Sequence, residues 1–424
     1  MGPLRRSLAW LSALALAPLL GLAWLLRPSL REGVGERLGR LPEGGPEGCI
    51  WIHGASVGEA AAALRLVDLL RARGHAVRAS TTTATGRALL ARARPDLPVS
   101  LAPLDHPLAV EAALARVRPS VLVLVETELW PAWIAGAHRA GIPVLVVSGR
   151  LSDASFPRYR RLARWLAPTL ARISLVGARS EEDARRFREL GLPAERVEVT
   201  GDLKLEPLAS PELASDLAAT LGSAPCLVAG STHEGEEAAV LDAFSRVRDA
   251  GLEAALVLAP RHPERFAMVA GLLERRGVAS RRRSEADGTP LAPGEILLLD
   301  GLGELSAVYG RAHSTFVGGS LVPGVGGHNV LEPVFAARPV RFGPHTENAR
   351  EAVRIALASG AGARVDDAEA LAVAWIDDLR RPGQADAAGA AGRAALSPHE
   401  GAACRAADRI DSLLADRRAG RASR

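Results

Sequence analysis

The chain has 424 residues, of which 48% are hydrophobic, 24% are charged and only 4% are aromatic, enough for two globular domains with mainly aliphatic cores. The formal net charge of +4 is too small to indicate a nucleic-acid partner. Three cysteines without a CxxC pair argue against a disulfide scaffold or a zinc ribbon, and they favour a reducing compartment.

Residues 7–26, SLAWLSALALAPLLGLAWLL, carry no charge and are long enough to cross a bilayer core as a helix. Arginines flank the run on both sides and leave its orientation undecided. The alternative is a cleaved signal peptide, but the run is longer than a usual signal core, and Arg-Pro follows where small residues would be expected. We therefore expect residues 1–28 to form an uncleaved anchor that spans the membrane or lies in one leaflet.

Short apolar runs then alternate with helical runs rich in Ala, Leu and Arg, the pattern of parallel strands with crossover helices. The proline-marked stretch 202–215 interrupts this alternation, so we expect two successive doubly wound α/β domains joined near residues 203–222. We place these domains at residues 45–205 and 220–400, followed by a C-terminal helix or tail at 401–424. The predicted strands are 49–56, 76–83, 99–104, 120–126, 142–149, 173–178, 197–201, 226–231, 254–261, 295–301, 314–320 and 339–344.

Acidic residues follow two strand ends in the first predicted domain. Glu59 comes after a Ser-Val-Gly bend and opens a strongly helical stretch, and Glu126 follows the fourth strand. Because ligands bind beyond the carboxyl ends of such strands, we expect Glu59 and Glu126 to converge. A helix start favours an ionised carboxylate, which can act as a general base; the alternative is an ordinary first-turn glutamate.

Turns follow four strand ends in the second predicted domain, and three of them contain glycine. Arg261 lies in one of the four turns, and in the last, His328 and Asn329 can cap a helix whose N–H groups would receive a phosphate. Glu332, one turn into that helix, can reach ribose hydroxyls. One such turn is a weak signal, but together they predict a nucleotide site. The turns are residues 230–237, 259–266, 300–305 and 316–333.

Lys204 is the only lysine among 52 Lys and Arg residues. Lysine presents a compact ammonium, whereas arginine presents a planar fork of donors. A single lysine in an arginine-biased chain indicates a site that needs a point charge; chance survival is the alternative.

Nine strings together resemble the 3-deoxy-D-manno-octulosonic acid (Kdo) transferase family, from about residue 30 to the end of the second domain. The resemblance implies a GT-B glycosyltransferase, in which two Rossmann-like domains face a cleft. Residues 322–325, VPGV, make one loop look a residue longer than in some members. The strings are ASVGE, TTTATG, ETELWP, RLSDASFPRYRRL, TGDLKL, GSTHEGEE, APRHPERF, FVGGSL and GGHNVLEP.

Position by position, the resemblance implies that Glu59 is the proton acceptor and that Glu126 and Lys204 support the transition state. It also implies transfer of Kdo from CMP-Kdo to a glucosamine hydroxyl of a lipid A precursor, with inversion, at the cytoplasmic face of the inner membrane. The residues that match CMP-contacting segments are Pro260, Arg261, Leu302, Gly303, Glu304, Asn329, Val330, Leu331 and Glu332.

We expect no catalytic metal and no cofactor, because the sequence holds neither an Asp-x-Asp pair nor a histidine and cysteine cluster with ligand spacing. The histidines are expected to be structural, with His53 and His328, near the site, as the exceptions to test. Residues 158–172, RYRRLARWLAPTLAR, offer a basic and partly apolar face for anionic lipid, with a solvated helix face as the alternative.

Two other functions stay open at this point. Another GT-B transferase could use a UDP-sugar donor, and product analysis separates the two donors. A membrane-anchored scaffold could bind nucleotide or lipid without turnover, which a Glu59→Gln variant would test.

Overall fold

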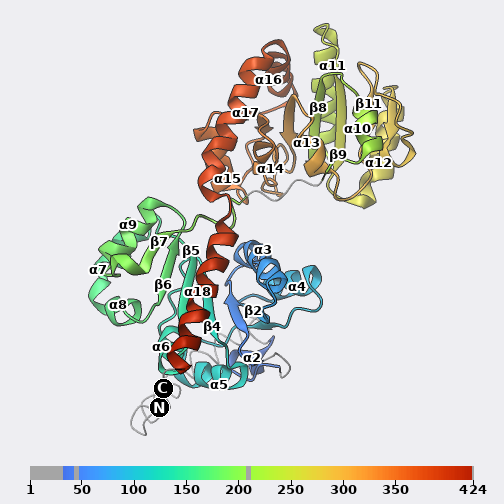
Figure 1. The fold of residues 1–424 in the computed structure, drawn as a ribbon. Coiled ribbons are helices and arrows are strands. Elements are labelled where there is room, and N and C mark those ends of the chain that lie inside the picture. The colour runs from blue at the N-terminus through green and yellow to red at the C-terminus, as the bar shows by residue number, and fades with distance from the viewer. Residues whose placement is uncertain (1–31, 43–46, 207–211, 423–424) are drawn as a thin grey trace. The chain divides into compact units, whose positions relative to one another are not determined.

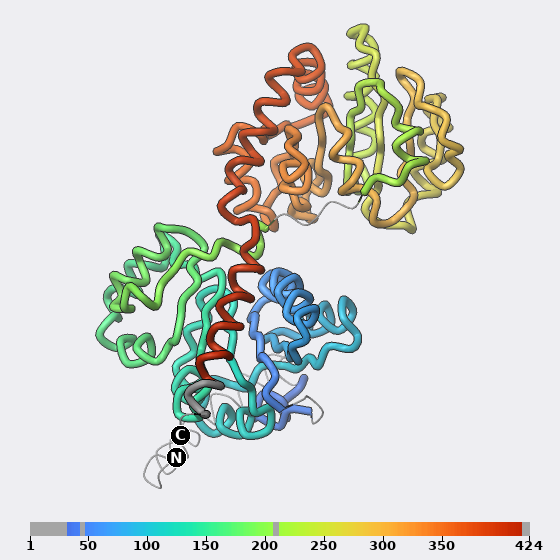
Figure 2. Tube along the Cα trace, viewed as in Figure 1, coloured from blue at the N-terminus to red at the C-terminus, as the bar shows by residue number. Residues whose placement is uncertain are grey.

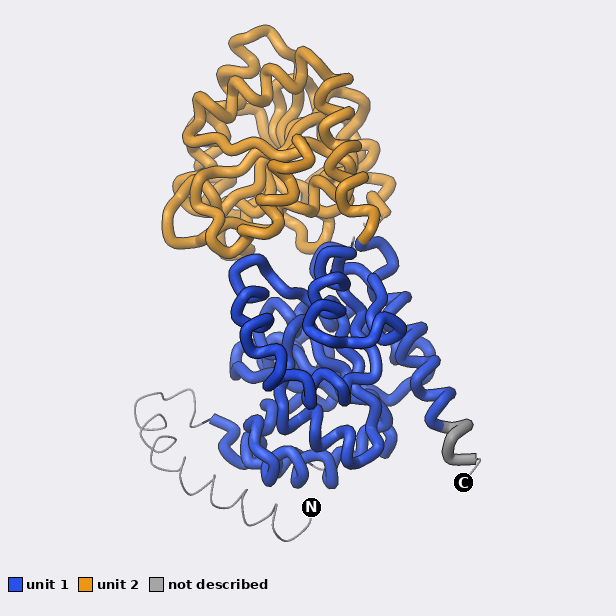
Figure 3. The backbone as a smooth tube through the Cα atoms, turned by 90° about the vertical axis from the view of Figure 1, so that its left-hand side faces the viewer, with its two compact units in different colours: residues 1–206, 399–424 blue, residues 207–398 orange. Residues whose placement is uncertain are grey.

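The computed structural model describes residues 32–42, 47–206 and 212–422 of the chain. It divides into two compact units (Figure 3): unit 1 comprises residues 1–206 and 399–424, and unit 2 comprises residues 207–398. The expected anchor, residues 1–28, lies outside the described residues. Within the described part, no helix combines the length and apolar character needed to cross a membrane. The expectation that the two units face a cleft stays a prediction.

Unit 1 is built on a seven-stranded parallel sheet with the order β3-β2-β1-β4-β5-β6-β7 (Figure 1). Each of the seven strands lies within a predicted apolar run, which confirms the doubly wound α/β reading of this half. The strands are β1 Ile50–His53, β2 Val77–Thr81, β3 Val99–Leu101, β4 Val121–Val125, β5 Val144–Gly149, β6 Leu175–Ala178 and β7 Val197–Val199.

Side chains of these strands alternate between two cores, one on each face of the sheet. On β1, Trp51 joins one core, whereas Ile50 and Ile52 join the other. The helices of unit 1 are α2 Val34–Arg37, α3 Val57–Ala72, α4 Ala84–Ala93, α5 Pro107–Val117, α6 Pro131–Arg139, α7 Phe156–Arg161, α8 Ala163–Leu170, α9 Glu181–Glu189, the 3-10 turn η2 Ala194–Arg196 and, at the end of the chain, α18 Ala402–Ala422.

Helix α18 returns to the first half of the chain and packs beside α3 (Figure 2). Its buried residues recur every three or four positions and join the same core as Ile50 and Ile52. The final helix, expected as a separate segment, is therefore part of the core of unit 1. The buried residues are Ala402, Ala403, Ala406, Ala407, Ile410 and Leu414.

Unit 2 holds a second seven-stranded parallel sheet, with the order β10-β11-β9-β8-β12-β13-β14. The sequence predicted its five inner strands and missed β10 and β14, which are three residues long and only partly buried at the two edges. Edge strands lack the apolar run that marks a buried strand. The strands are β8 Cys226–Thr232, β9 Ala255–Pro260, β10 Ser280–Arg282, β11 Ile296–Leu298, β12 Ser314–Val317, β13 Val340–Phe342 and β14 Gly362–Arg364.

Helices flank the sheet of unit 2, and α11 and α16 pack together over one face around Phe244 and Trp375. The helices are α10 Ser215–Leu221, α11 Glu236–Asp249, α12 Phe266–Arg275, α13 Leu305–Tyr309, α14 Leu331–Phe335, α15 Arg350–Ala358, α16 Ala368–Arg380 and α17 Pro382–Leu396, with 3-10 turns η3 Pro263–Arg265, η4 Arg283–Glu285 and η5 Ser397–His399.

Three non-glycine residues with positive φ lie at the carboxyl ends of strands. They are Glu126 (φ 61°) after β4, Ser148 (φ 54°) in β5 and Ser231 (φ 56°) in β8. Side chains other than glycine rarely adopt this conformation, and such strain often occurs at functional sites. The carboxyl edges of both sheets are therefore the places to look for chemistry.

Candidate active site

Glu59 is the third residue of α3 and forms a capping box with Ser56. The Glu59 N–H donates to Ser56 Oγ at 3.2 Å, and the Ser56 hydroxyl donates to Glu59 Oε1 at 2.8 Å. Glu59 Oε2 accepts the Ala55 N–H at 2.7 Å and the Ser56 N–H at 3.4 Å. The carboxylate is thus buried and held in one orientation by the turn before its own helix.

Lys204 forms an ion pair with Glu126, the residue of positive φ at the end of β4. Lys204 Nζ also lies beside the first turn of α3, because a Cβ built on Gly58 would be 3.6 Å from it. Gly58 is the neighbour of Glu59 in the chain. The structure therefore brings together the three residues that the sequence singled out in the first half.

Glu128 belongs to the same group of charges. Burial raises the pKa of the Glu128 carboxyl, and the negative charges of Glu59 and Glu126 raise it further. The Trp130 indole donates a hydrogen bond to Glu128 Oε2, which lowers the same pKa. β4 ends at Val125, and the turn that follows leaves the Glu128 carboxylate near those of Glu59 and Glu126.

Asp202 supports the backbone of Lys204 and was not singled out from the sequence. Its Oδ1 accepts the Lys204 N–H at 2.9 Å, and its own N–H donates to His399 Nδ1 at 3.2 Å. Burial raises the pKa of the Asp202 carboxyl, against the backbone hydrogen bond and the charge of Arg179. This segment of unit 1 thus fixes where the lysine side chain starts.

His53, at the end of β1, is a core residue. Its ring is fully buried against Trp130 and Trp133, and Nδ1 lies 3.0 Å from Ser80 Oγ. Burial lowers its pKa to about 4, so the ring is neutral at physiological pH. His53 is one of the two histidines that the sequence set apart for testing, and its burial gives it the structural setting expected of the others.

Three histidines follow three neighbouring strands of unit 2: His262 comes after β9, His233 after β8 and His328 after β12. His233 Nε2 and His328 Nε2 are 2.8 Å apart, and the ring of His262 stands edge-on to His233 at 5.2 Å between centroids. Burial lowers the pKa of His328 to about 4, and the positive charge of Arg261 adds to this.

Among residues 32–42, 47–206 and 212–422, no cluster of three or more His, Cys, Asp or Glu side chains could hold a metal ion. The expectation that catalysis uses no metal stays a prediction.

Glu236 organises the glycine-rich loop beside these histidines, and the sequence reasoning missed its role. Its side chain is fully buried, and it accepts the N–H groups of Gly319, Ser320 and Leu321 at 2.7, 2.9 and 2.8 Å. Gly318 must lack a side chain, since a Cβ there would lie 2.6 Å from the Ser231 carbonyl oxygen. The one available signal was a glutamate in the first turn after the Gly-Ser-Thr turn.

The predicted CMP-contacting segments all lie in unit 2, but their residues differ in exposure and in interaction partners. Arg261 is exposed, and its charge opposes the rise that burial causes in the Glu332 pKa. Asn329 Oδ1 caps the Leu331 N–H at 3.1 Å before the short helix α14. Leu302 is exposed, whereas Glu304 pairs with Arg283 at 2.9 Å.

The basic stretch at residues 158–172 forms most of α7 and all of α8. Trp165 is 85% exposed and Leu162 is 47% exposed, although both are large apolar side chains. The arginines Arg158, Arg160, Arg161 and Arg164 lie in the same two helices. Unit 1 thus presents an apolar surface interleaved with positive charge.

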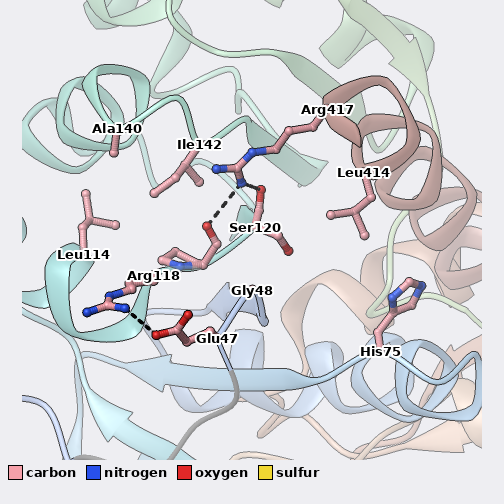
Figure 4. A pocket seen from close by; sticks show the side chains of 11 residues that line it. Glu47, Gly48, His75, Leu114, Arg118, Ser120, Ala140, Ile142, Leu414 and Arg417 are labelled. Atoms are coloured by element: carbon pink, nitrogen blue, oxygen red, sulfur yellow. Dashed lines mark hydrogen bonds and ion pairs between the residues drawn. The ribbon is translucent and has the colours of Figure 1, made fainter. Parts of the chain in front are cut away.

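A hollow of about 570 Å³ lies at the opposite edge of the unit 1 sheet, where strands begin (Figure 4). Arg417 of α18 donates to the Ser120 carbonyl oxygen, and Arg118 pairs with Glu47. None of the predicted site residues lines this hollow. In sheets of this type ligands bind at the carboxyl edge, so the hollow is not the candidate site.

Comparison with known proteins gives the family. The family described as 3-deoxy-D-manno-octulosonic-acid transferase (kdotransferase) matches residues 32–207. The chain is 36% identical over 431 residues to the 3-deoxy-D-manno-octulosonic acid transferase of Bordetella pertussis, covering 96% of this chain and 99% of that protein. It is 35% identical over 346 residues to the Haemophilus influenzae protein of the same name, covering 79% of this chain and 80% of that protein.

Among solved structures, Acinetobacter baumannii MurG aligns with a TM-score of 0.54 at 12% identity, over 87% of this chain and 100% of that one. The glycotransferase of kitacinnamycin aligns with a TM-score of 0.51 at 16% identity, over 87% and 99%. These likenesses show the fold alone, a GT-B-like glycosyltransferase fold with two Rossmann-like domains. The sequence relatives show that the chain belongs to the 3-deoxy-D-manno-octulosonic acid (Kdo) transferase family of glycosyltransferases.

Proposed function

We propose that this chain transfers Kdo from CMP-Kdo to a glucosamine hydroxyl of a lipid A precursor, with inversion, in lipopolysaccharide core synthesis. The observation that carries the proposal is the Lys204–Glu126 ion pair beside the first turn of α3, the turn that contains Glu59. Unit 1 would bind the acceptor and unit 2 the donor.

Glu59 takes the proton from the attacking hydroxyl in this proposal. Its Oε2 is occupied by two backbone N–H groups, whereas Oε1 accepts one described hydrogen bond, from the Ser56 hydroxyl. A carboxylate oxygen has two lone pairs, so Oε1 keeps one for the acceptor. The capping box that fixes the helix start therefore also orients the base.

Lys204 supplies positive charge next to that base. Its side chain is 37% exposed while Glu126 is 19% exposed, so the ammonium is the more accessible member of the pair. Negative charge develops on the departing CMP and is already present on the Kdo carboxylate. A fixed ammonium stabilises such charge best where water is excluded.

Unit 2 offers a positive charge and several imidazole rings for the donor phosphate. Arg261 and the three histidines lie at the carboxyl ends of the central strands, where ligands of doubly wound sheets bind. The loop that Glu236 holds lets the backbone approach a ligand closely. We propose that this edge binds CMP, with Asn329 and Glu332 near the ribose.

The acceptor is an anionic lipid, so the enzyme would work at a membrane surface. Residues 1–28 provide the expected anchor at the cytoplasmic face of the inner membrane. The exposed Trp165 and Leu162, set among arginines, would rest on lipid head groups or bind acceptor phosphates.

The decisive experiment is mass analysis of the product formed from CMP-Kdo and a tetraacylated lipid A precursor by the full-length protein. One or more added Kdo residues support the proposal. Activity only with a UDP-sugar donor would replace it with the alternative transferase, and CMP binding without turnover would favour a scaffold. Unchanged turnover after chelation with EDTA is expected, because no step of the proposal uses a metal.

A further inference from the structure

The hydrogen-bonded pair of His233 and His328 has no role in the proposal so far. The two Nε2 atoms are 2.8 Å apart although the residues are 95 positions apart in the chain. The rings are nearly parallel, with an interplanar angle of 17° and centroids 5.0 Å apart. At this distance one Nε2 carries a hydrogen and the other offers its lone pair, so the pair shares a single proton on its inner side.

The side chains around the histidine pair are mainly basic. Arg261, His262 and Arg265 face His233, and Arg261 and His262 face His328. Glu236, whose negative charge favours the protonated form of His233, is fully buried and engaged with backbone N–H groups of the glycine loop. In the free protein this surrounding positive charge opposes a second proton on the imidazole pair.

A bound CMP-sugar changes that balance. It brings a phosphate and, in CMP-Kdo, the sugar carboxylate, so that two negative charges arrive beside Arg261. Opposite charge favours the protonated form of a histidine, and interacting histidines titrate as one unit. Half-exposed imidazoles next to a nucleotide site can therefore gain a proton when the nucleotide binds.

We propose that His233 and His328 form a proton-binding pair that takes up one proton when the nucleotide binds and donates a charge-assisted hydrogen bond to the departing phosphate. The inference rests on the proposed function, because it needs CMP at this edge of unit 2. The pair adds to the reaction what arginine cannot, a positive charge that appears with the ligand and leaves with it.

The transfer step breaks one bond, forms one bond and moves one proton from the acceptor to Glu59. The bond between the anomeric carbon of Kdo and the phosphate oxygen breaks, and its electron pair goes to that oxygen. The acceptor oxygen forms the new bond to the anomeric carbon and gives its proton to Glu59. The protonated histidine pair donates a hydrogen bond to the new phosphate charge and returns its proton to solvent when CMP leaves.

The test measures protons rather than product. Full-length protein is titrated with CMP by calorimetry near pH 7.5 in buffers of different ionisation enthalpy, which gives the protons taken up per CMP bound. We expect a clear net uptake by the wild type and its loss in both His233→Gln and His328→Gln. Glutamine keeps a nitrogen donor near the Nε2 position but cannot be protonated. His138→Gln, on an exposed helix end of unit 1, is the matched control and should take up protons as the wild type does.

The pH profile of kcat supplies a second readout. Activity of the wild type should fall as pH rises through the pKa of the liganded pair, and each variant should lack that alkaline limb and lose about 10²-fold in kcat at its optimum. Wild-type uptake of no proton, or equal uptake in the variants, overturns the pair proposal while leaving the proposed function intact. Absence of CMP binding by the wild type overturns the proposed function itself.

Discussion

The carboxyl edges of the two sheets occupy equivalent places in two similar units, yet they carry opposite chemistry. In unit 1 this edge gathers Glu59, Glu126 and Glu128 around the single ammonium of Lys204. In unit 2 it gathers three histidines with Arg261, and the Glu236 carboxylate there holds the glycine-rich loop. The fold supplies the same place twice, and in the proposed function the side chains make one edge remove a proton and the other stabilise negative charge.

The difference extends to how each carboxylate is used. Glu59 leaves one oxygen with a single described hydrogen bond, from the Ser56 hydroxyl, whereas Glu236 accepts four backbone N–H groups. A carboxylate with spare acceptor capacity can take part in chemistry, and a saturated one serves structure. The two glutamates follow the same strand-to-helix pattern in sequence, so this contrast belongs to the tertiary contacts.

Removing the base should have the largest effect. Glu59→Gln should lower kcat by about 10²–10⁴-fold, because an amide cannot take the acceptor proton. Glutamine also completes a capping box, so the thermal midpoint should stay close to that of the wild type. Rates of Kdo transfer and thermal unfolding are the measurements. Glu181→Gln, in the first turn of α9, is the matched control with unchanged rate, and full turnover by Glu59→Gln would remove Glu59 from its role.

Replacing Lys204 should have the second largest effect. Lys204→Arg should lower kcat by about 10²-fold, since a guanidinium binds Glu126 as a fork and cannot place a compact charge beside Gly58. Thermal unfolding should change little. The reverse exchange Arg94→Lys, at the partly exposed pair with Asp68, provides the control for cation exchange as such. A fully active arginine variant would show that the lone lysine is accidental.

Replacing Glu236 in unit 2 should lower both the stability of the protein and its affinity for CMP. Glu236→Gln turns two oxygen acceptors into one and aims an amide N–H₂ at backbone donors, which should cost about 1–3 kcal/mol in the free energy of unfolding. CMP affinity should fall with it. Denaturant unfolding and CMP titration check this, with Glu234→Gln, an exposed neighbour, as control. Unchanged stability would mean that the loop does not need this carboxylate.

The smallest effect at neutral pH concerns His53. Its pKa is lowered to about 4 from 6.5, so the unfolded chain binds a proton in this range that the folded chain does not. Stability therefore falls as pH drops through 6.5 and levels off near 4, by about 3 kcal/mol in total. Unfolding curves between these pH values should show this loss in the wild type and less of it in His53→Gln. His138→Gln should keep the whole pH dependence.

The two histidines with a pKa near 4 sharpen the comparison further. Burial against tryptophans lowers that of His53, whereas His328 is also surrounded by Arg261, His262 and His233. An added anion can offset the positive charge around His328, but it cannot offset the burial of His53. CMP should therefore change the acid behaviour of unit 2 and leave that of His53 as it is.

Local pattern determined much of this protein. Apolar runs predicted twelve of the fourteen described strands, including the edge strands β3 and β7, and with them the strand-end positions of Glu59, Glu126 and Arg261. The pattern failed at the edge strands β10 and β14 because neither has a fully buried residue, so neither needs an apolar run. It also included Glu126 in the fourth predicted strand, whereas β4 ends at Val125 and Glu126 adopts a positive φ.

Contacts between strand ends were decided only by the tertiary structure. The Lys204–Glu126 pair, the grip of Glu236 on the glycine loop and the histidine pair each join segments far apart in the chain. Likewise, the sequence predicted a C-terminal helix, but it did not predict that α18 packs into the core of unit 1. The physical reason is that strand order and crossover geometry decide which ends become neighbours, whereas sequence periodicity reports only which face of each element is buried.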